Sequence, residues 1–302
     1  GNNLPLTYPF VLQFPLVMKL MTSSDFPFSA VGSVHVENRI RRFRQIPVTE
    51  HLTISTQAGN LREHRKGLLI DITSRFEVGG ELVCEQVGTF LSQQKTSLSD
   101  AERGPAPKEA APPPPDAVLS VNLGQIRNYA AASGDRNPIH MGNLPAKAFG
   151  FPRAIAHGMW SAAAAVANVS NQLTEAVDYQ VRFGRPILLP ATVNLYTKAA
   201  GGPGDYDISI LDRKKGFLDT VSAVRRDQRI GARIGGSVST GSGIGGSQCP
   251  GSGFGGSTSG TSGGHPTAGR RSGFTARDTL ATSTVASGAG VVRTTAGRRA
   301  NG

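Results

Sequence analysis

The sequence offers little that would support a disulfide-rich, metal-binding or membrane-spanning protein. Only two of its 302 residues are cysteines, and Cys84 and Cys249 lie far apart without the spacing of a metal site. The apolar segment 4–21 is interrupted by three prolines, so we expect neither a signal peptide nor a membrane span. These absences predict a reduced, cytoplasmic protein.

Acidic residues are scarce in one region, the C-terminal tail. Residues 225–302 hold ten arginines and two aspartates and supply most of the net charge of +11. Because 20 of the 38 glycines lie within 231–302, this segment has few side chains to bury. We therefore predict a disordered Gly/Ser/Thr/Arg-rich tail over 227–302. Its arginines are not interleaved with aromatic residues on which bases could stack, so we do not expect the tail to bind nucleic acid.

The first half of the chain has the pattern of a curled antiparallel sheet. Apolar residues recur at every second position over 68–78, which is the period of a half-buried strand. Gly79 and Gly80 then predict the turn of a hairpin, and residues 58–60 predict an earlier turn. We expect a short helix over 14–22, before these strands.

A linker separates this half from a second unit. Residues 96–116 are rich in alanine and proline, which favours a semi-rigid connection. Beyond the linker we expect one helix over 121–132, a second helix over 158–173, and strands between 179 and 223. The second helix is apolar on all sides and must be surrounded by protein, which predicts a sheet wrapped around it.

The strongest functional signal lies between residues 133 and 159. Asp135 and His140 supply a carboxylate and an imidazole five residues apart, and Pro138 stiffens the backbone between them. Gly158 follows at the expected start of the apolar helix, where unpaired N–H groups and the helix dipole favour developing negative charge. An acid/base pair beside such a terminus can add water to a carbon next to a polarised carbonyl, or remove it.

The segments 129–140 (YAAASGDRNPIH) and 155–159 (IAHGM) resemble the MaoC-like (R)-specific enoyl-CoA hydratases, also called 3-hydroxyacyl-thioester dehydratases. The resemblance covers about residues 118–224, and the first half is similar to the degenerate first half of two-domain members. It implies an α+β fold, a double hot-dog, in which two antiparallel sheets each wrap around a central helix. The implied division is a degenerate hot-dog domain over 1–95, a linker over 96–116 and a catalytic domain over 117–226.

The family resemblance also implies roles for individual residues. Asp135 and His140 match the catalytic pair, and the backbone N–H of Gly158 matches the group that binds the thioester oxygen. Asn137, Ser133 and His157 are expected to support them. The resemblance implies no metal ion and no redox cofactor. The histidines of the first half are expected to be solvated or packed within strands; they are His35, His51 and His64.

The predicted activity is reversible hydration of trans-2-enoyl thioesters and dehydration of (R)-3-hydroxyacyl thioesters. The expected substrates are linked to coenzyme A or to an acyl carrier protein, and the carrier protein is a candidate partner. The two units would form a pseudo-dimer within one chain. Two such chains could also associate as a homodimer. One alternative is a hot-dog protein that binds acyl thioesters without turnover, and a weaker one is a thioesterase, because this fold hosts several activities.

Overall fold

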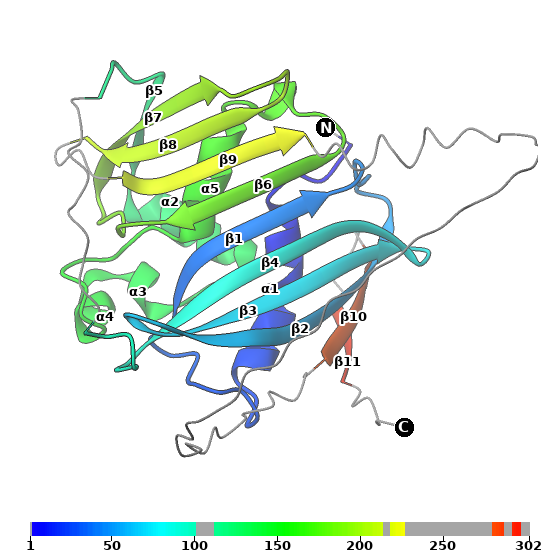
Figure 1. Ribbon diagram of the computed structural model, residues 1–302, viewed down its shortest axis with the longest axis horizontal. Coiled ribbons are helices and arrows are strands. Elements are labelled where there is room, and N and C mark those ends of the chain that lie inside the picture. The colour runs from blue at the N-terminus through cyan, green and yellow to red at the C-terminus, as the bar shows by residue number, and fades with distance from the viewer. Residues whose placement is uncertain (1, 101–111, 214–217, 227–279, 287–291, 297–302) are drawn as a thin grey trace, which may run out of the picture.

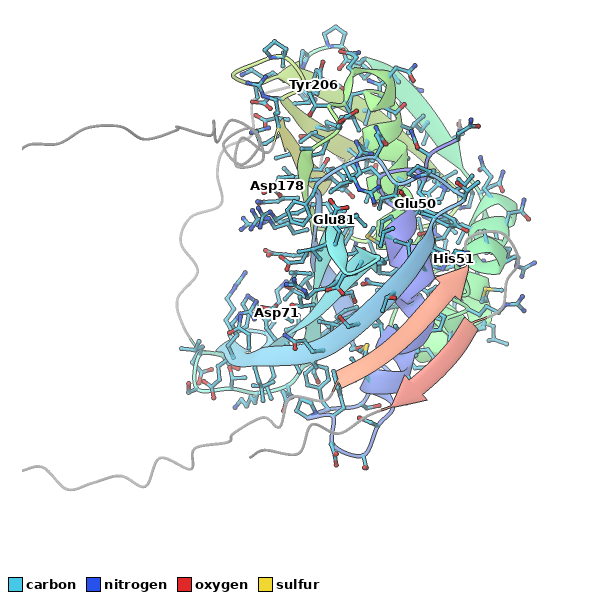
Figure 2. The ribbon with its side chains drawn as sticks, turned by 90° about the vertical axis from the view of Figure 1, so that its right-hand side faces the viewer. Glu50, His51, Asp71, Glu81, Asp178 and Tyr206 are labelled. Atoms are coloured by element: carbon cyan, nitrogen blue, oxygen red, sulfur yellow. The ribbon has the colours of Figure 1, made fainter. Side chains whose placement is uncertain are left out.

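One antiparallel sheet runs through the whole molecule (Figure 1). The computed structural model describes residues 2–100, 112–213, 218–226, 280–286 and 292–296. Within these residues the sheet has eleven strands in the order β11-β10-β2-β3-β4-β1-β6-β9-β8-β7-β5. Seen edge-on, it carries the helices on one face, and Asp71 and Asp178 point from the other (Figure 2).

The first half forms the strands that the alternating pattern predicts. Their bounds are β1 Val34–Arg42, β2 His51–His64, β3 Gly67–Val78 and β4 Glu81–Gln93. The hairpin turn at Gly79 and Gly80 is confirmed, since both adopt the positive φ of 57° and 88° that such a turn requires. The turn expected at 58–60 is wrong. Strand β2 continues through these residues, and a bulge with Asn60 at φ 53° absorbs the irregularity.

The helix of the first half is longer than the sequence indicated. Helix α1 spans Tyr8–Met21, because Pro9 in its first turn needs no hydrogen-bond partner and Pro15 is accommodated inside it. Its buried residues include Phe10, Leu16 and Leu20. It lies against β2, β3, β4 and β10, so the first part of the sheet curves around it (Figure 1).

The second half begins with β5 Ala117–Val121 and α2 Leu123–Ser133. The helix expected over 121–132 starts two residues later, because Asn122 and Gln125 form a reciprocal capping box that fixes its first turn. The helix expected over 158–173 ends sooner. Here α5 spans Gly158–Ala167, and Val169 N then donates to Val166 O, which leads into the short 3₁₀ helix η1 Ser170–Gln172.

The remaining strands of the second half repeat the order of the first. They are β6 Val177–Phe183, β7 Ala191–Ala199, β8 Tyr206–Asp212 and β9 Leu218–Arg226. The order β1-β4-β3-β2 in one half corresponds to β6-β9-β8-β7 in the other. The halves meet where β1 pairs with β6, and the buried Arg42 crosses this seam to donate to the backbone oxygens of Thr174 and Glu175.

Part of the C-terminal tail belongs to the sheet. Strand β10 spans Leu280–Ala286 and pairs with β2, and β11 spans Val292–Ala296 and pairs with β10. The prediction of disorder over 227–302 is wrong for these two segments, because β2 has an open edge whose backbone groups can pair with them. The rest of that prediction lies outside the described residues.

No helix in the described part of the chain is long and apolar enough to cross a membrane. The longest is α1, with 14 residues, and it has a polar Gln13 among its buried side chains. A span of the hydrocarbon layer needs about 20 apolar residues.

Candidate active site

The loop that carries Asp135 is shaped by residues that end one helix and begin the next. Helix α2 is capped at its C-terminus by Gly134, whose φ of 76° turns the chain sharply and favours glycine. The Asp135 carboxylate accepts a hydrogen bond from Asn137 N at 3.2 Å, and Ser133 Oγ accepts one from Asp135 N at 3.3 Å. Asn137 in turn caps α3 (Pro138–Met141), its side chain accepting from Ile139 N at 3.4 Å.

His140 lies on α3 and is held in one tautomer. Its Nδ1 is 2.9 Å from the carbonyl oxygen of Ile155, which accepts only, so Nδ1 carries the proton. The side chain is buried and lines the cavity described below. The neutral ring therefore has its lone pair on Nε2, where it can act as a base.

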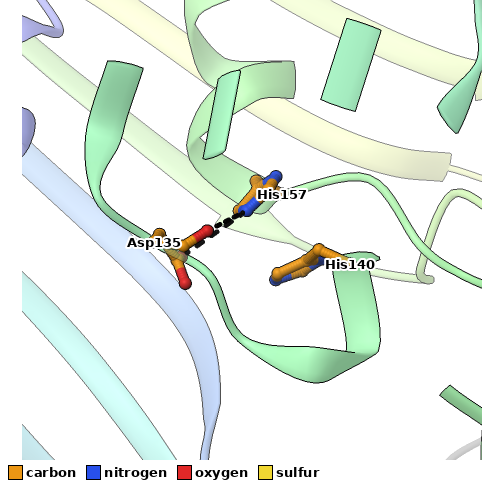
Figure 3. Close-up of side chains that lie close together, drawn as sticks. All are labelled: Asp135, His140 and His157. Atoms are coloured by element: carbon orange, nitrogen blue, oxygen red, sulfur yellow. Dashed lines mark hydrogen bonds and ion pairs between the residues drawn. The ribbon is translucent and has the colours of Figure 1, made fainter. Parts of the chain in front are cut away.

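His157 joins the predicted pair from the residue before α5. Its Nε2 donates to the carbonyl oxygen of Asp135 at 2.9 Å, and its ring stacks on that of His140 with centroids 3.7 Å apart (Figure 3). The Asp135 carboxylate is further from it, at 3.9 Å. His157 therefore fixes both members of the pair, one through the backbone and the other through its ring.

Burial controls the protonation of all three groups. It raises the pKa of the Asp135 carboxyl, which His140 partly offsets, and it lowers the pKa of His140, which Asp135 partly offsets. Burial and the proximity of His140 lower the pKa of His157 to about 3. His157 is thus neutral at physiological pH, and its contact with Asp135 is a hydrogen bond to the backbone oxygen rather than an ion pair with the carboxylate.

The same three side chains form a group that could hold a metal ion in the described part of the chain. Their ligand atoms all lie within 4.8 Å of one another. Each histidine already donates one ring nitrogen to a backbone carbonyl, which leaves one ring nitrogen apiece. A carboxylate beside two neutral imidazoles is also a complete acid/base set, which needs no metal.

Gly158 is the first residue of α5, and its neighbours explain the glycine. The side chain of His157, at the N-cap, makes no capping hydrogen bond, so it leaves the first N–H groups of the helix to another partner. A Cβ on Gly158 would lie 3.1 Å from the Phe183 ring. Close packing, rather than an unusual φ, therefore favours glycine here, and the positive end of the helix dipole lies at the cavity.

One cavity of about 760 Å³ brings the predicted residues together. Asp135, Asn137, His140, His157 and Gly158 all line it, whereas Ser133 is not among the lining residues and supports Asp135 from behind. The first half supplies much of the rest of the wall. From α1 come Phe10, Phe14, Val17, Met18 and Met21, from β1 come Val34, His35 and Val36, and from β4 come Phe90 and Leu91.

The sequence did not indicate that His35 belongs to this cavity. Its ring stacks against those of Phe10 and Phe90, with centroids 5.5 Å and 4.6 Å away, and burial lowers its pKa to about 4. The expectation of a solvated or strand-packed histidine is correct only in its second part. No local signal could have placed His35 here, since its neighbours come from α1 and β4.

Comparison with known proteins identifies the family. Residues 106–210 match the family described as MaoC like domain. The 3-hydroxyacyl-thioester dehydratase X of Mycobacterium tuberculosis is 49% identical over 225 residues, which are 74% of this chain and 80% of that protein. The chain therefore belongs to the MaoC-like dehydratase family, as the sequence motif predicted.

Solved structures agree with this assignment. The crystal structure of HtdX from Mycobacterium tuberculosis has 48% sequence identity and a TM-score of 0.68, covering 75% of this chain and 90% of that one. A MaoC-like dehydratase from Phytophthora capsici has 20% identity and a TM-score of 0.55, covering 72% of this chain and 83% of that one. The second likeness concerns the fold alone. The antiparallel sheet thus has the hot-dog-like architecture of these dehydratases.

Proposed function

We propose that this protein catalyses the reversible hydration of trans-2-enoyl thioesters and the dehydration of (R)-3-hydroxyacyl thioesters. The observation that carries the proposal is that Asp135, His140 and Gly158 line one cavity. The identity of 49% to a 3-hydroxyacyl-thioester dehydratase supports the reaction class. The reaction needs no redox chemistry, because water is only added or removed.

In the hydration direction a water molecule bound between Asp135 and His140 is the nucleophile. One of the two groups accepts its proton while its oxygen bonds to C3 of the enoyl chain, and C2 receives a proton from the same pair, so that the pair ends in its starting protonation state. Positioned acid/base groups contribute about 10²–10⁴ in rate. The Gly158 N–H donates to the thioester oxygen as negative charge develops there, and such a donor contributes roughly 3–4 kcal/mol. Dehydration follows the same steps in reverse.

The first half is proposed to bind the acyl chain. Its contribution to the cavity wall is mostly apolar and comes from α1, β1 and β4. It contains no Asp-x-Asn-Pro-x-His string, so the reacting groups come from the second half. An acyl chain lying along α1 would have its thioester at Gly158, where the cavity meets the start of α5.

The repeated strand order supports two hot-dog units within the chain. We propose that residues 1–95 and 117–226 are these units, with α1 and α5 as their helices and 96–116 as the linker. The β1–β6 seam would then make them a pseudo-dimer. This arrangement accounts for a cavity that takes its wall from one unit and its acid/base pair from the other.

A cationic rim is proposed to bind the phosphate end of the carrier. Lys66, Arg136 and Arg185 line the cavity and are exposed, whereas Asp135 is its one acidic lining residue among those described. Both coenzyme A and the phosphopantetheine of a carrier protein place a phosphate beyond the pantetheine arm, and cations at the entrance favour such a group.

The rim is tested with Lys66→Gln. We expect KM to rise severalfold for crotonyl-CoA and to stay unchanged for the crotonyl thioester of N-acetylcysteamine, which has no phosphate. Arg65→Gln is the matched control, since Arg65 is exposed beside Lys66 but does not line the cavity. Equal KM changes for both thioesters would rule out the rim. A greater rise for a crotonyl carrier protein than for crotonyl-CoA would identify the carrier protein as the partner.

The reaction itself is tested by following crotonyl-CoA hydration by the loss of enoyl absorbance. The wild type should hydrate crotonyl-CoA. In Asp135→Asn, which preserves the shape of the side chain and removes the carboxylate, kcat should fall about 10³-fold. Asp178→Asn is the control, because Asp178 points from the opposite face of the sheet (Figure 2). Acyl-CoA binding without turnover would show that the protein binds acyl thioesters without hydrating them. Release of free thiol would indicate a thioesterase.

A further inference from the structure

We propose that His35, in the first half of the chain, is a positioning residue for the reaction: acting through Phe183, it sets the place of the Gly158 N–H. This inference rests on the proposed role of Gly158. His35 and Phe183 lie at 5.0 Å between ring centroids, with their planes tilted by 58°. Phe183 in turn lies against Gly158, where a Cβ would be 3.1 Å from the ring. A continuous line of contacts thus joins β1 to the start of α5.

A bulge in β1 directs the His35 ring into the cavity. His35 pairs with Phe90 of β4, but the register shifts before Glu37, which pairs with Thr89. Such a bulge re-aims the neighbouring side chain and is common beside active sites. Gly88 of β4 leaves the space for the ring, because a Cβ there would lie 3.3 Å from His35 Nε2.

Two phenylalanine rings restrict the orientation of His35. Phe10 of α1 and Phe90 of β4 lie nearly parallel to it, with interplanar angles of 12° and 11°. Because two rings stack against it, the His35 ring has little freedom to rotate, and Phe183 packs against a restrained partner. The first half therefore fixes the group that presses on the start of α5.

A buried polar network anchors the same ring. Asn38 Nδ2 lies 3.4 Å from His35 Nε2, and Asn38 Oδ1 accepts from Gln86 Nε2 at 3.2 Å. Asn38 and Gln86 are both fully buried. The lowered pKa of about 4 keeps His35 uncharged at neutral pH, so it fits a packing and orienting role better than that of a proton donor.

The position of Gly158 can be measured without substrate. In the ¹⁵N–¹H spectrum of the full chain, His35→Ala and Phe183→Leu should each move the Gly158 amide resonance, and the double variant should move it no further than the larger single change. His51→Ala is the control, because His51 is an exposed histidine that does not line the cavity. An unmoved Gly158 resonance in His35→Ala would overturn the inference, whether or not the protein hydrates enoyl thioesters.

Kinetics with crotonyl-CoA then separate positioning from folding. We expect His35→Ala to lower kcat about tenfold with KM within about twofold, as for a displaced oxyanion donor. His35→Phe retains a ring and should recover kcat to within about threefold. A lowered melting temperature with unchanged kcat in His35→Ala would reduce His35 to a structural role and overturn the proposal. An inactive wild type would instead refute the proposed function and leave the spectroscopic test valid.

Discussion

The two halves of the molecule share a strand order and differ in chemistry. The first has the longer elements, with strands of up to 14 residues and a helix of 14, whereas the second has strands of 7 to 9 residues beyond β5 and main helices of 11 and 10 residues. The first half supplies apolar wall, and the second supplies Asp135, His140 and Gly158. Under the proposed function, the same architecture serves one half as a binding surface and the other as a reaction site.

The starts of the two helices show how this difference arises. Helix α1 begins with Tyr8 and Pro9, and proline has no N–H to offer a substrate oxygen. Helix α5 begins with Gly158, which has no side chain to cover its N–H. In the proposed function this difference lets the start of α5, but not that of α1, serve as the oxyanion site.

The largest predicted effect contrasts histidines of the two halves. In His140→Asn the amide nitrogen can still donate to Ile155 O, but the Nε2 lone pair is lost, so kcat for crotonyl-CoA should fall about 10³-fold. His51→Asn in the first half should retain wild-type kcat. If His140→Asn retained more than a tenth of kcat, the base would have to be sought elsewhere.

The seam between the halves is tested by two arginines of β1. Arg42→Met leaves the backbone oxygens of Thr174 and Glu175 without their donors, so it should lower the free energy of unfolding by about 2–4 kcal/mol. Arg39→Met breaks a partly exposed ion pair with Asp178 and should lower it by less than about 1 kcal/mol. Urea titration measures both, and equal losses would show that Arg42 does not join the halves in the way described.

Placing an alanine at the start of each helix sharpens the comparison further. Gly158→Ala places a Cβ against the Phe183 ring, so kcat should fall about tenfold with little change in KM. Tyr8→Ala, at the start of α1, should leave both constants unchanged. Steady-state kinetics of the two variants measure both constants. An unaffected kcat in Gly158→Ala would show that turnover does not depend on the position of the Gly158 N–H.

The smallest effect concerns acid stability. The pKa of His35 is about 4 in the folded protein and about 6.5 in the unfolded chain, so the unfolded chain takes up the proton first as pH falls. The stability present above pH 6.5 is therefore lost on acidification, by about 1 kcal/mol per such histidine between pH 6.5 and 5.5. His157, with a pKa of about 3, behaves likewise.

His35→Phe removes the contribution of the first half alone. Urea titrations at pH 6.5 and 5.5 should show that the loss of stability shrinks by about 1 kcal/mol in this variant. The remaining loss would include the contribution of His157 in the second half. An unchanged loss in His35→Phe would mean that its ring is not desolvated in the folded protein.

The sequence predicts the parts of the site that depend on short segments. Asp135, His140 and Gly158 come from two segments close together in the chain, and their local turns and helix start bring them to one cavity. The alternating strands of the first half were likewise visible, because their period is local.

Other features depend on partners that are distant in the chain. His35 enters the cavity through a bulge that only the pairing of β1 with β4 reveals. Arg42 is buried because β1 meets β6. The apparent turn at 58–60 is overridden by the continued pairing of β2 with β3. Local propensity is a weak guide wherever such tertiary pairing decides the outcome.

The central claim is that one cavity joins an acyl-binding wall in the first half to an acid/base pair in the second. The most direct test is the ratio of kcat/KM for a sixteen-carbon enoyl-CoA to that for crotonyl-CoA, in the wild type and in Ala30→Trp, which adds bulk to the first-half wall. We predict that the ratio falls at least about tenfold while crotonyl-CoA turnover stays within about twofold. An unchanged ratio would contradict the account, because the acyl chain would then lie outside the first half.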